Sequence, residues 1–515
     1  MHPTHNAAER PDKPAFIMAS TGEVVTFRQL DERSNQIAHY FRSIGLQVGD
    51  SLALCMENNR RYLEICWAAQ RAGLYYTCIS SYLTAPEVAY IVEDCGATLF
   101  ITSEAKSDIA RELNGQLPTC PNMLMVGAPI DGADGFDAAV DHMPTTPIAD
   151  QMEGHDMLYS SGTTGRPKGI KIPLEGRPLG EVTPSLMAIA ALYQLGPDTV
   201  YLSPAPLYHA APLRYNMVIT RLGGTSIIMD RFEPERALQL AQDYKCTHSQ
   251  WVPTMFVRML KLPQEVRERY DLSTMKIAIH AAAPCPVEVK KQMMDWWGPV
   301  IYEYYGGTEG NGFVAANPQE WLAHPGTVGR AFVGQLKITD IDNPEQELPV
   351  GEEGAVYFAD GPEFNYHNSP DKTAESTNAN GWTTLGDIGR MDEDGFLYLT
   401  DRKAYTIITG GVNVYPQEIE DRLILHPDVM DAAVVGVPDE DFGEVVKGVV
   451  QLRDHNKASP DMEQALIAYC REALSGMKTP KSIDFEAELP RHANGKLYKR
   501  LLKDRYWGKA DSRIV

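Results

Sequence analysis

The sequence predicts an α/β protein with a large N-terminal domain of layered α/β subdomains including one small β subdomain, and a small α+β C-terminal domain. The first observation is length, because 515 residues exceed what one hydrophobic core usually serves. The second is an alternation of short apolar runs with amphipathic helical patterns. The third is charge: residues 402–515 carry a net charge of −1 out of a total of −22. This shift predicts two domains, 1–401 and 402–515.

The N-terminal elements follow a parallel α/β pattern. Thr26 can cap a helix whose apolar residues recur at helical spacing until Gly45 ends it. Apolar runs between such helices predict buried strands, of which the clearest are Ser51–Cys55, Thr98–Ile101, Ser226–Met229 and Met275–Ile279. Because helices separate consecutive strands, we expect parallel sheets.

Two later segments have a different pattern. Val333–Phe358 holds strand-like pieces separated by Asp-Asn-Pro and Gly-Glu-Glu-Gly turns, which predicts the small β subdomain. In the tail, Ala432–Val437 and Gly448–Leu452 are typical of strands, and Met462–Leu474 is typical of a helix. The tail is therefore expected to fold as a compact α+β unit.

Composition narrows the class of protein. The chain is 43% hydrophobic and 23% charged, as in soluble globular proteins, and we expect no integral membrane segment and no signal peptide. Its eight cysteines include no C-x-x-C pair, which favours reduced thiols in the cytoplasm. A net charge of −22 makes nucleic acid and anionic membranes poor partners.

The segment from Tyr159 to Gly169 is the most informative in the chain. Glycines can turn backbone N–H groups toward one point, where the hydroxyl groups and Lys168 add further donors. Such a cluster suits the phosphates of a nucleoside triphosphate, although the spacing differs from that of a P-loop. A flexible linker is the alternative interpretation. The candidate phosphate-binding residues are Ser160, Ser161, Gly162, Thr163, Thr164, Gly165 and Lys168.

Further motifs suit the rest of a nucleotide. In Glu303–Gly310, Tyr305 can stack on a purine, Gly306 allows close approach, and Thr308 with Glu309 can reach magnesium and phosphate. Upstream, Ala282 and Ala283 leave room for a flat ring.

Two further candidates are weaker when taken singly. Asp387 can accept two ribose hydroxyls, although a turn aspartate is the simpler interpretation. Lys496 follows a turn glycine, where most lysines are solvated surface residues.

Taken together, these motifs resemble the adenylate-forming (ANL) superfamily over essentially the whole chain. That superfamily includes acyl-CoA synthetases, nonribosomal adenylation domains and beetle luciferases. Tyr159–Gly169 is highly specific to it, and Tyr-Gly-Gly-Thr-Glu, Leu-Gly-Asp, Asp-Arg-Lys and Gly-Lys follow in the expected order. The resemblance implies ATP, Mg²⁺ and CoA as cofactors, and a C-terminal domain that is mobile.

The resemblance also assigns roles to individual residues. It places Thr163, Thr164, Lys168 and Thr308 at the phosphates, Glu309 with Thr308 at magnesium, and Tyr305 on adenine. Asp387 and Arg402 would hold the ribose, Lys496 would bridge the carboxylate and the α-phosphate, and Gly410 with Gly411 would reach the thiol channel. The chain departs from the family at Ala404, a hinge position usually occupied by Asp or Lys.

The nature of the acid rests on weaker signals. His209 in Tyr208-His209-Ala210 resembles the acyl-pocket element of the family, although a structural histidine explains it equally well. Trp251, Val252, Met255 and Phe256 can line an apolar pocket or belong to the core.

The motif around Tyr305 is most similar to that of fatty-acid and bulky alicyclic acid CoA ligases. We therefore expect an acyl-CoA synthetase that acts on an apolar carboxylic acid. An enzyme that loads a separate carrier protein and a non-catalytic ligand-binding relative remain as alternatives, and a homodimer is left open.

Lys496→Ala provides a direct test of the assigned role. Two anions must approach each other when AMP is transferred to a carboxylate, and a lysine with a reference pKa of about 10.4 is charged at neutral pH. Loss of such a contact costs about 3–4 kcal/mol of transition-state stabilisation. We expect adenylation to be crippled while CoA-dependent consumption of a supplied acyl-adenylate stays largely intact. Equal loss of both half-reactions would contradict this role.

Overall fold

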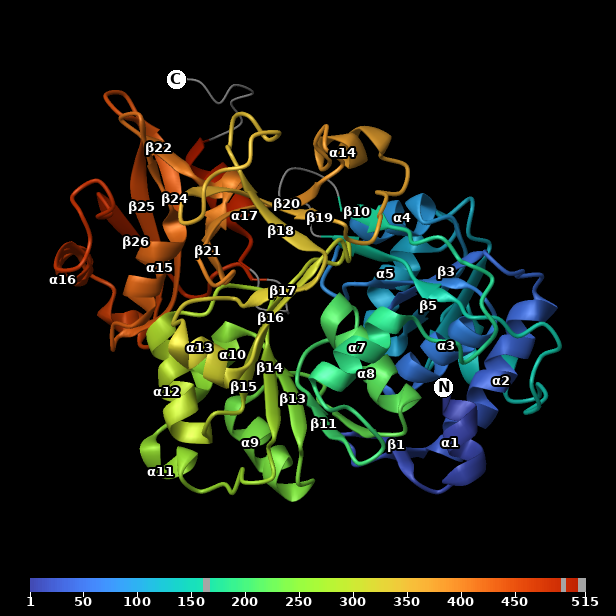
Figure 1. The fold of residues 1–515 in the computed structure, drawn as a ribbon. Coiled ribbons are helices and arrows are strands. Elements are labelled where there is room, and N and C mark those ends of the chain that lie inside the picture. Colours follow the sequence, from blue (N-terminus) through green and yellow to red (C-terminus); the bar gives the residue numbers. More distant parts are fainter. Residues whose placement is uncertain (161–166, 492–496, 508–515) are drawn as a thin grey trace.

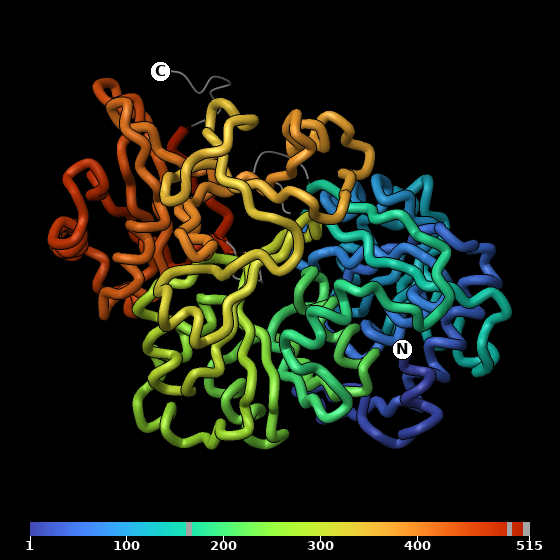
Figure 2. The backbone as a smooth tube through the Cα atoms, in the orientation of Figure 1, coloured from blue at the N-terminus to red at the C-terminus, as the bar shows by residue number. Residues whose placement is uncertain are grey.

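The computed structural model describes residues 1–160, 167–491 and 497–507, and Figures 1 and 2 show their arrangement. An all-parallel sheet of six strands lies in the N-terminal part, with strand order β7-β6-β5-β3-β4-β8. Its strands are β3 (Ser51–Cys55), β4 (Tyr75–Ile79), β5 (Ala97–Ser103), β6 (Asn122–Val126), β7 (Asp134–Gly135) and β8 (His155–Asp156). The helices of this region are α1 (Pro3–Glu9), α2 (Phe27–Ser43), α3 (Arg60–Arg71), α4 (Ala85–Asp94), α5 (Ser107–Leu113) and α6 (Phe136–Val140).

A second sheet of nine strands is parallel at its centre and antiparallel at its edges, in the order β17-β16-β15-β14-β13-β11-β12-β1-β2. Its strands are β1 (Pro14–Met18), β2 (Val24–Thr26), β11 (Val200–Ser203), β12 (Thr225–Ile228), β13 (His248–Trp251), β14 (Ile277–His280), β15 (Ile301–Tyr305), β16 (Phe313–Ala316) and β17 (Arg330–Val333). Its helices are α7 (Pro184–Leu192), α8 (Ala210–Arg221), α9 (Pro234–Asp243), α10 (Pro253–Leu260), α11 (Gln264–Arg267), α12 (Val287–Trp297) and α13 (Pro318–Ala323).

The hydrophobic core lies mainly on the two faces of the nine-stranded sheet. One cluster joins both large sheets through α2, α3 and α8, and includes Phe16, Trp67 and Leu213. The other cluster packs α9, α10 and α12 against the opposite face, around Trp251 and Phe256. Burial of apolar side chains on both faces explains why β1 and the first three residues of β14 are continuously apolar.

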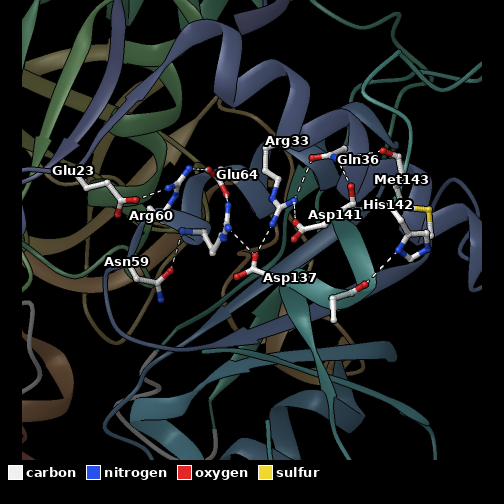
Figure 3. A network of polar contacts seen from close by, with 12 residues as sticks. Glu23, Arg33, Gln36, Asn59, Arg60, Glu64, Asp137, Asp141, His142 and Met143 are labelled. Carbon is white, nitrogen blue, oxygen red and sulfur yellow. Dashed lines mark hydrogen bonds and ion pairs between the residues drawn. The ribbon is translucent and has the colours of Figure 1, made fainter. Parts of the chain in front are cut away.

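Charged contacts fix the helical layer between the sheets. The Arg33 guanidinium of α2 donates to the carboxylates of Asp137 in α6 and of Asp141 just after it, as Figure 3 shows. In α3, the carboxylate of Glu64 accepts from Arg60 and, at 2.7 Å, from Arg61. Because Glu64 is fully buried, these cations supply the pairing that a buried carboxylate needs.

Smaller β units complete the N-terminal region. An antiparallel sheet consists of β18 (Gln335–Thr339), β19 (Glu353–Ala359), β20 (Thr383–Met391) and β21 (Leu397–Arg402), with α14 (Pro370–Glu375) between β19 and β20. A separate antiparallel hairpin consists of β9 (Leu158–Ser160) and β10 (Lys168–Ile170).

The C-terminal unit has its own sheet and core, and Figure 1 shows it beside the nine-stranded sheet. It begins after a short 3₁₀ turn, Lys403–Tyr405, that contains Ala404. Its strands are β22 (Ile407–Thr409), β23 (Val412–Val414), β24 (Val429–Asp439), β25 (Gly443–Leu452) and β26 (Ser482–Glu486), and its helices are α15 (Pro416–Ile424), α16 (Pro460–Arg471) and α17 (Lys499–Trp507).

The predicted fold class is confirmed. The expected helix after Thr26 is α2, where Thr26 and Gln29 form a reciprocal capping box. The expected strands correspond to β3, β5, β12, β14, β24 and β25, and the tail helix to α16. The β subdomain expected at Val333–Phe358 is present and extends to Arg402. Among the described residues, no helix is both long and apolar enough to span a bilayer.

Candidate active site

A cavity of about 1390 Å³ lies between the N-terminal sheets and the C-terminal unit. Its walls come from the hairpin β9–β10, from segments that follow β11, β13, β14 and β15, from β20 and β21, and from α15 and the start of α17. The sequence-predicted residues that line it are Ser160, Lys168, His209, Ala282, Ala283, Tyr305, Gly306, Thr308, Glu309, Asp387 and Arg402.

The hairpin places the two ends of the predicted phosphate loop side by side. Ser160 and Lys168 are register partners in β9 and β10, so the loop joins two short antiparallel strands. Ser161, Gly162, Thr163, Thr164 and Gly165 lie outside the described residues. The Lys168 ammonium lies 4.7 Å from the ring centroid of Tyr366, so a tyrosine face supports the base of the loop.

Tyr366 connects this lysine to the predicted magnesium residue. Its hydroxyl donates to Oε1 of Glu309 at 2.8 Å, and Glu309 is buried. Burial and the nearby Lys372 lower the pKa of Lys168, while Glu309 and Glu375 act in the opposite direction. One carboxylate oxygen of Glu309 is therefore engaged by Tyr366, and Oε2 is available to a ligand in the cavity.

Thr308 is held from behind by a charged pair. Arg214 of α8 donates to the backbone oxygen of Thr308 at 3.3 Å and to Oδ2 of Asp156 at 2.8 Å. Burial alone would raise the pKa of Asp156, but Arg214 and His155 lower it below its ordinary value. The Asp156–Arg214 pair therefore stays ionised and fixes the backbone at Thr308.

Asp387, Arg402 and Tyr305 form one hydrogen-bonded group. Asp387 and Arg402 are register partners on β20 and β21, and Arg402 Nε lies 3.0 Å from Asp387 Oδ1. The Tyr305 hydroxyl donates to Asp387 Oδ2 at 2.7 Å. The neighbouring Asp387 raises the pKa of Arg402, and burial followed by Asp387 raises that of Tyr305. This aspartate is thus an oriented acceptor rather than the free turn residue of the alternative interpretation.

A buried charged cluster lies below the small residues that follow β14. Lys290 Nζ and His280 Nε2 lie 2.6 Å and 3.3 Å from Oε2 of Glu303. Burial opposes ionisation of Glu303, but His280 and Lys290 hold its pKa at about 2. Next to this cluster, Ala282 has a φ of 76°, a conformation that is uncommon without glycine, and it lines the cavity together with Ala283.

The apolar part of the wall includes Tyr208, His209, Trp251, Val252 and Met255. Three of the four residues predicted for an apolar pocket therefore line the cavity. The fourth, Phe256, does not: it is fully buried and packs against Trp251, Trp297 and His280 in the core. The ring of Phe256 points from α10 into the core, whereas its neighbours Met255 and Val257 also line the cavity.

The C-terminal unit contributes the remaining wall. Lys496 lies outside the described residues, but Arg491 and Leu497, on either side of residues 492–496, both line the cavity and form an isolated β-bridge. Gly410 and Gly411 form the turn between β22 and β23, both with positive φ. Neither glycine belongs to the cavity wall in this structure.

Sequence reasoning missed Tyr366, Arg214 and Asp156. Tyr366 stands in an ordinary-looking segment, Asn365-Tyr366-His367, with no periodic or glycine signal. Arg214 lies on the face of α8 that also carries Arg221, so no sequence pattern distinguishes it. The assembled group can receive a polyanion at the hairpin and a hydroxyl-bearing ring at Asp387.

Comparisons with known proteins give a consistent result. The profile of the AMP-binding enzyme family matches residues 3–363, and that of the AMP-binding enzyme C-terminal domain matches residues 418–496. The chain is 32% identical over 496 residues to feruloyl-CoA synthase of Amycolatopsis sp, covering 94% of each chain. It is 30% identical over 543 residues to a long-chain-fatty-acid–CoA ligase of Escherichia coli O6:H1, covering 99% of this chain and 94% of that one. The ATP-bound crystal structure of MatB from Rhodopseudomonas palustris superimposes with a TM-score of 0.81 at 27% identity and 99% coverage of both chains.

Lys290→Met tests the buried cluster. Removal of one partner of a buried ion pair leaves Glu303 uncompensated, which typically costs about 3–5 kcal/mol, so we expect a lower urea midpoint. Lys291→Met, at an exposed neighbour on the same helix, is the matched control and should leave the midpoint unchanged.

The same variant should alter the acid dependence of stability. The pKa of Glu303 falls from 4.5 to about 2 on folding, so its contribution is complete above about pH 4.5 and is lost as the pH falls toward 2. That decline should be smaller in Lys290→Met. An unchanged urea midpoint and acid profile would show that the cluster does not stabilise the fold.

Proposed function

We propose that this chain, which belongs to the AMP-binding enzyme family and is an AMP-forming acid–CoA ligase, activates an apolar carboxylic acid such as a fatty acid or a bulky alicyclic acid. ATP and CoA are its co-substrates and Mg²⁺ is its metal cofactor. The main support for this class of substrate is that most arginines of the cavity wall form ion pairs with acidic residues. An acid with a second carboxylate would need a cation that is free to receive it.

The arginines of the cavity wall are almost all neutralised by acidic neighbours. Arg221 pairs with Glu153 at 2.9 Å, with both side chains buried, and Arg214 pairs with Asp156. Further pairs are Arg177–Glu175, Arg231–Glu233, Arg402–Asp387 and Arg491–Asp431. Arg258, the remaining described arginine of the wall, lies 5.0 Å from the ring centroid of Phe232. These pairings disfavour a dicarboxylic acid.

Apolar and aromatic side chains supply the complementary surface. Trp251 is the last residue of β13, Val252 and Met255 follow that strand, and Leu186 with Ile189 of α7 also line the cavity. Burial of an acyl chain or ring against such a surface is favourable by about 25 cal/mol per Å². Tyr208 and His209, whose rings are 4.3 Å apart, provide the polar margin where the carboxylate would lie.

We assign the roles of the nucleotide-binding residues from their positions around the cavity. We assign the phosphates to Lys168 and to the loop residues 160–165, and the ribose hydroxyls to Asp387, which Arg402 and Tyr305 orient. The Tyr305 ring would stack on adenine, against the wall formed by Ala282 and Ala283. We place the domain boundary near residue 401, because β21, which ends at Arg402, belongs to the N-terminal sheet and β22, which begins at Ile407, belongs to the C-terminal one.

The chemistry explains why ATP is needed. A carboxylate reacts poorly with a thiol because oxide is a poor leaving group, whereas a mixed anhydride with AMP has a good one. Lys496 would neutralise the two anions as the carboxylate attacks the α-phosphate and pyrophosphate departs. In the second half-reaction the thiolate of CoA would attack the acyl carbonyl and release AMP, with Gly410 and Gly411 near the thiol channel.

The residues present fit a magnesium ion that is shared with phosphate. Mg²⁺ is commonly held by one or two carboxylates together with substrate phosphates. Among the described residues no cluster of three or more His, Cys, Asp or Glu side chains could hold a metal alone. Glu309 supplies one carboxylate and Thr308 a hydroxyl beside it, so the ion would bind with ATP and would offset the phosphate charge.

We also propose a cytoplasmic location. All eight cysteines are free, and all but Cys285 are buried. Free thiols persist most readily in a reducing compartment.

A panel of acids tests the substrate class. Purified protein is incubated with ATP, Mg²⁺, CoA and a mixture of fatty, alicyclic, aromatic and dicarboxylic acids, and the products are identified by mass spectrometry. We expect ATP-dependent acyl-CoA from apolar monocarboxylic acids, with release of AMP. Acyl-AMP without a thioester would favour a carrier-protein acceptor, and thioesters from dicarboxylic acids alone would refute the proposed acid class.

Tyr366→Phe tests the magnesium assignment. Without the Tyr366 hydroxyl, the Glu309 carboxylate loses the hydrogen bond that orients it, so the Mg²⁺ concentration for half-maximal activity should rise about tenfold. Tyr398→Phe, which removes a hydroxyl that donates to Asp392 at 3.0 Å, is the control and should not change it. An identical Mg²⁺ requirement in both variants would exclude the orienting role.

A further inference from the structure

One lysine of the N-terminal region reaches into the backbone of the C-terminal unit. Lys261, the C-cap residue of α10, donates through Nζ to the carbonyl of Val429, and lies 3.5 Å from those of Ile424 and Met430. Ile424 ends α15 and Val429 begins β24. The ammonium therefore caps the negative end of the α15 dipole, a favourable position for a cation.

The contact is reciprocal and partly apolar. Arg453, which follows β25, donates to the backbone oxygen of Lys261 at 3.1 Å. Ile424 packs against both the core around Trp251 and the core of the C-terminal unit. Figure 1 shows α15 next to α10 and α12 at this junction. The interface between α10 and the C-terminal unit thus combines hydrogen bonds and apolar packing around Lys261 and Ile424.

The start of β24, which Lys261 contacts, is also bonded to the residue that precedes the loop containing Lys496. Asp431 follows Met430, and its carboxylate accepts from Arg491 through Nε and, at 2.6 Å, through Nη2. Arg491 is the last described residue before 492–496, and it bridges to Leu497 on the other side. A continuous set of contacts therefore runs from Lys261 through the start of β24 to both ends of this loop.

Lys261 is suited to such a contact. Burial and Arg453 lower its pKa to about 8, against the opposing effect of Asp431. The side chain is thus largely shielded from water, and its hydrogen bonds to carbonyl groups are charge-assisted and short-range.

We propose that Lys261 is a positioning residue that docks the C-terminal unit in the orientation that places Arg491 and Leu497, on either side of residues 492–496, at the cavity. The proposal rests on the proposed function for its kinetic consequence, because the role proposed for Lys496 in adenylation needs the two ends of this loop at the cavity. Thioester formation from a preformed acyl-adenylate does not need Lys496 at the cavity and should not depend on the contact. Lys261 touches no substrate and acts only through the placement of this loop.

Lys261→Met separates the two half-reactions. Methionine keeps an apolar stem and removes the donors, so acid-dependent ATP–pyrophosphate exchange should fall about tenfold in kcat with little change in the KM for ATP. Consumption of a supplied acyl-adenylate by CoA should stay within about twofold. Lys261→Arg, which retains donors, should restore part of the exchange rate. Lys276→Met, at an exposed lysine just before β14, is the matched control and should behave as the unmodified protein.

Hydrogen–deuterium exchange tests the docking without any reliance on activity. Backbone amides of residues 424–432 and 253–262 should exchange faster in Lys261→Met than in the unmodified protein and in Lys276→Met. Unchanged exchange at both segments would overturn the proposal, and so would equal loss of both half-reactions together with a lower melting temperature. If the unmodified protein adenylated no acid, the proposed function would fail, while amide exchange would still decide whether Lys261 docks the unit.

Discussion

The parallel pairing of β11, β13, β14 and β15 is the constraint on which the site depends. Parallel strands end at the same edge of a sheet, so the segments that leave them converge. Here those segments bring Trp251 and Val252, Ala281–Ala283 and Gly306–Glu309 to one cavity wall. Hydrogen bonding within the sheet fixes the backbone up to that edge. The side chains that face the ligand can therefore differ without a change in this backbone framework.

Electrostatics explains why the site is built from local donors. A chain with a net charge of −22 repels a polyanion at long range, so attraction must arise within the cavity. The arginines of the wall are mostly committed to acidic partners, which leaves Lys168 and the glycine-rich loop to meet the phosphates. Asp387 serves the opposite need, since ribose hydroxyls are donors and require an oriented acceptor.

Completion of the site depends on the placement of the C-terminal unit. Arg491 and Leu497 reach the cavity only because α15 and β24 dock beside α10, and a few contacts around Lys261 and Ile424 hold that arrangement. Interfaces between domains that consist of few contacts commonly allow one domain to move relative to the other. A change in this docking would move the ends of loop 492–496 and leave the nucleotide-binding wall unaltered. Nucleotide binding therefore depends on the N-terminal region, and placement of the loop that contains Lys496 depends on the C-terminal unit.

The sequence by itself determined the fold class, the positions of strands β3, β5, β12, β14, β24 and β25, and the turns that carry glycine. These features are local, because hydrophobic periodicity, a capping box at Thr26 and the backbone freedom of glycine act within a few residues. The residue patterns alone indicated Glu309 and Asp387, and the family resemblance added the role of Arg402. Only the tertiary structure decided that Tyr366 supports Glu309, that Arg214 fixes Thr308, that Phe256 lies in the core and that Lys261 meets α15. Each of these contacts joins segments far apart in the chain, and no short pattern encodes such a meeting.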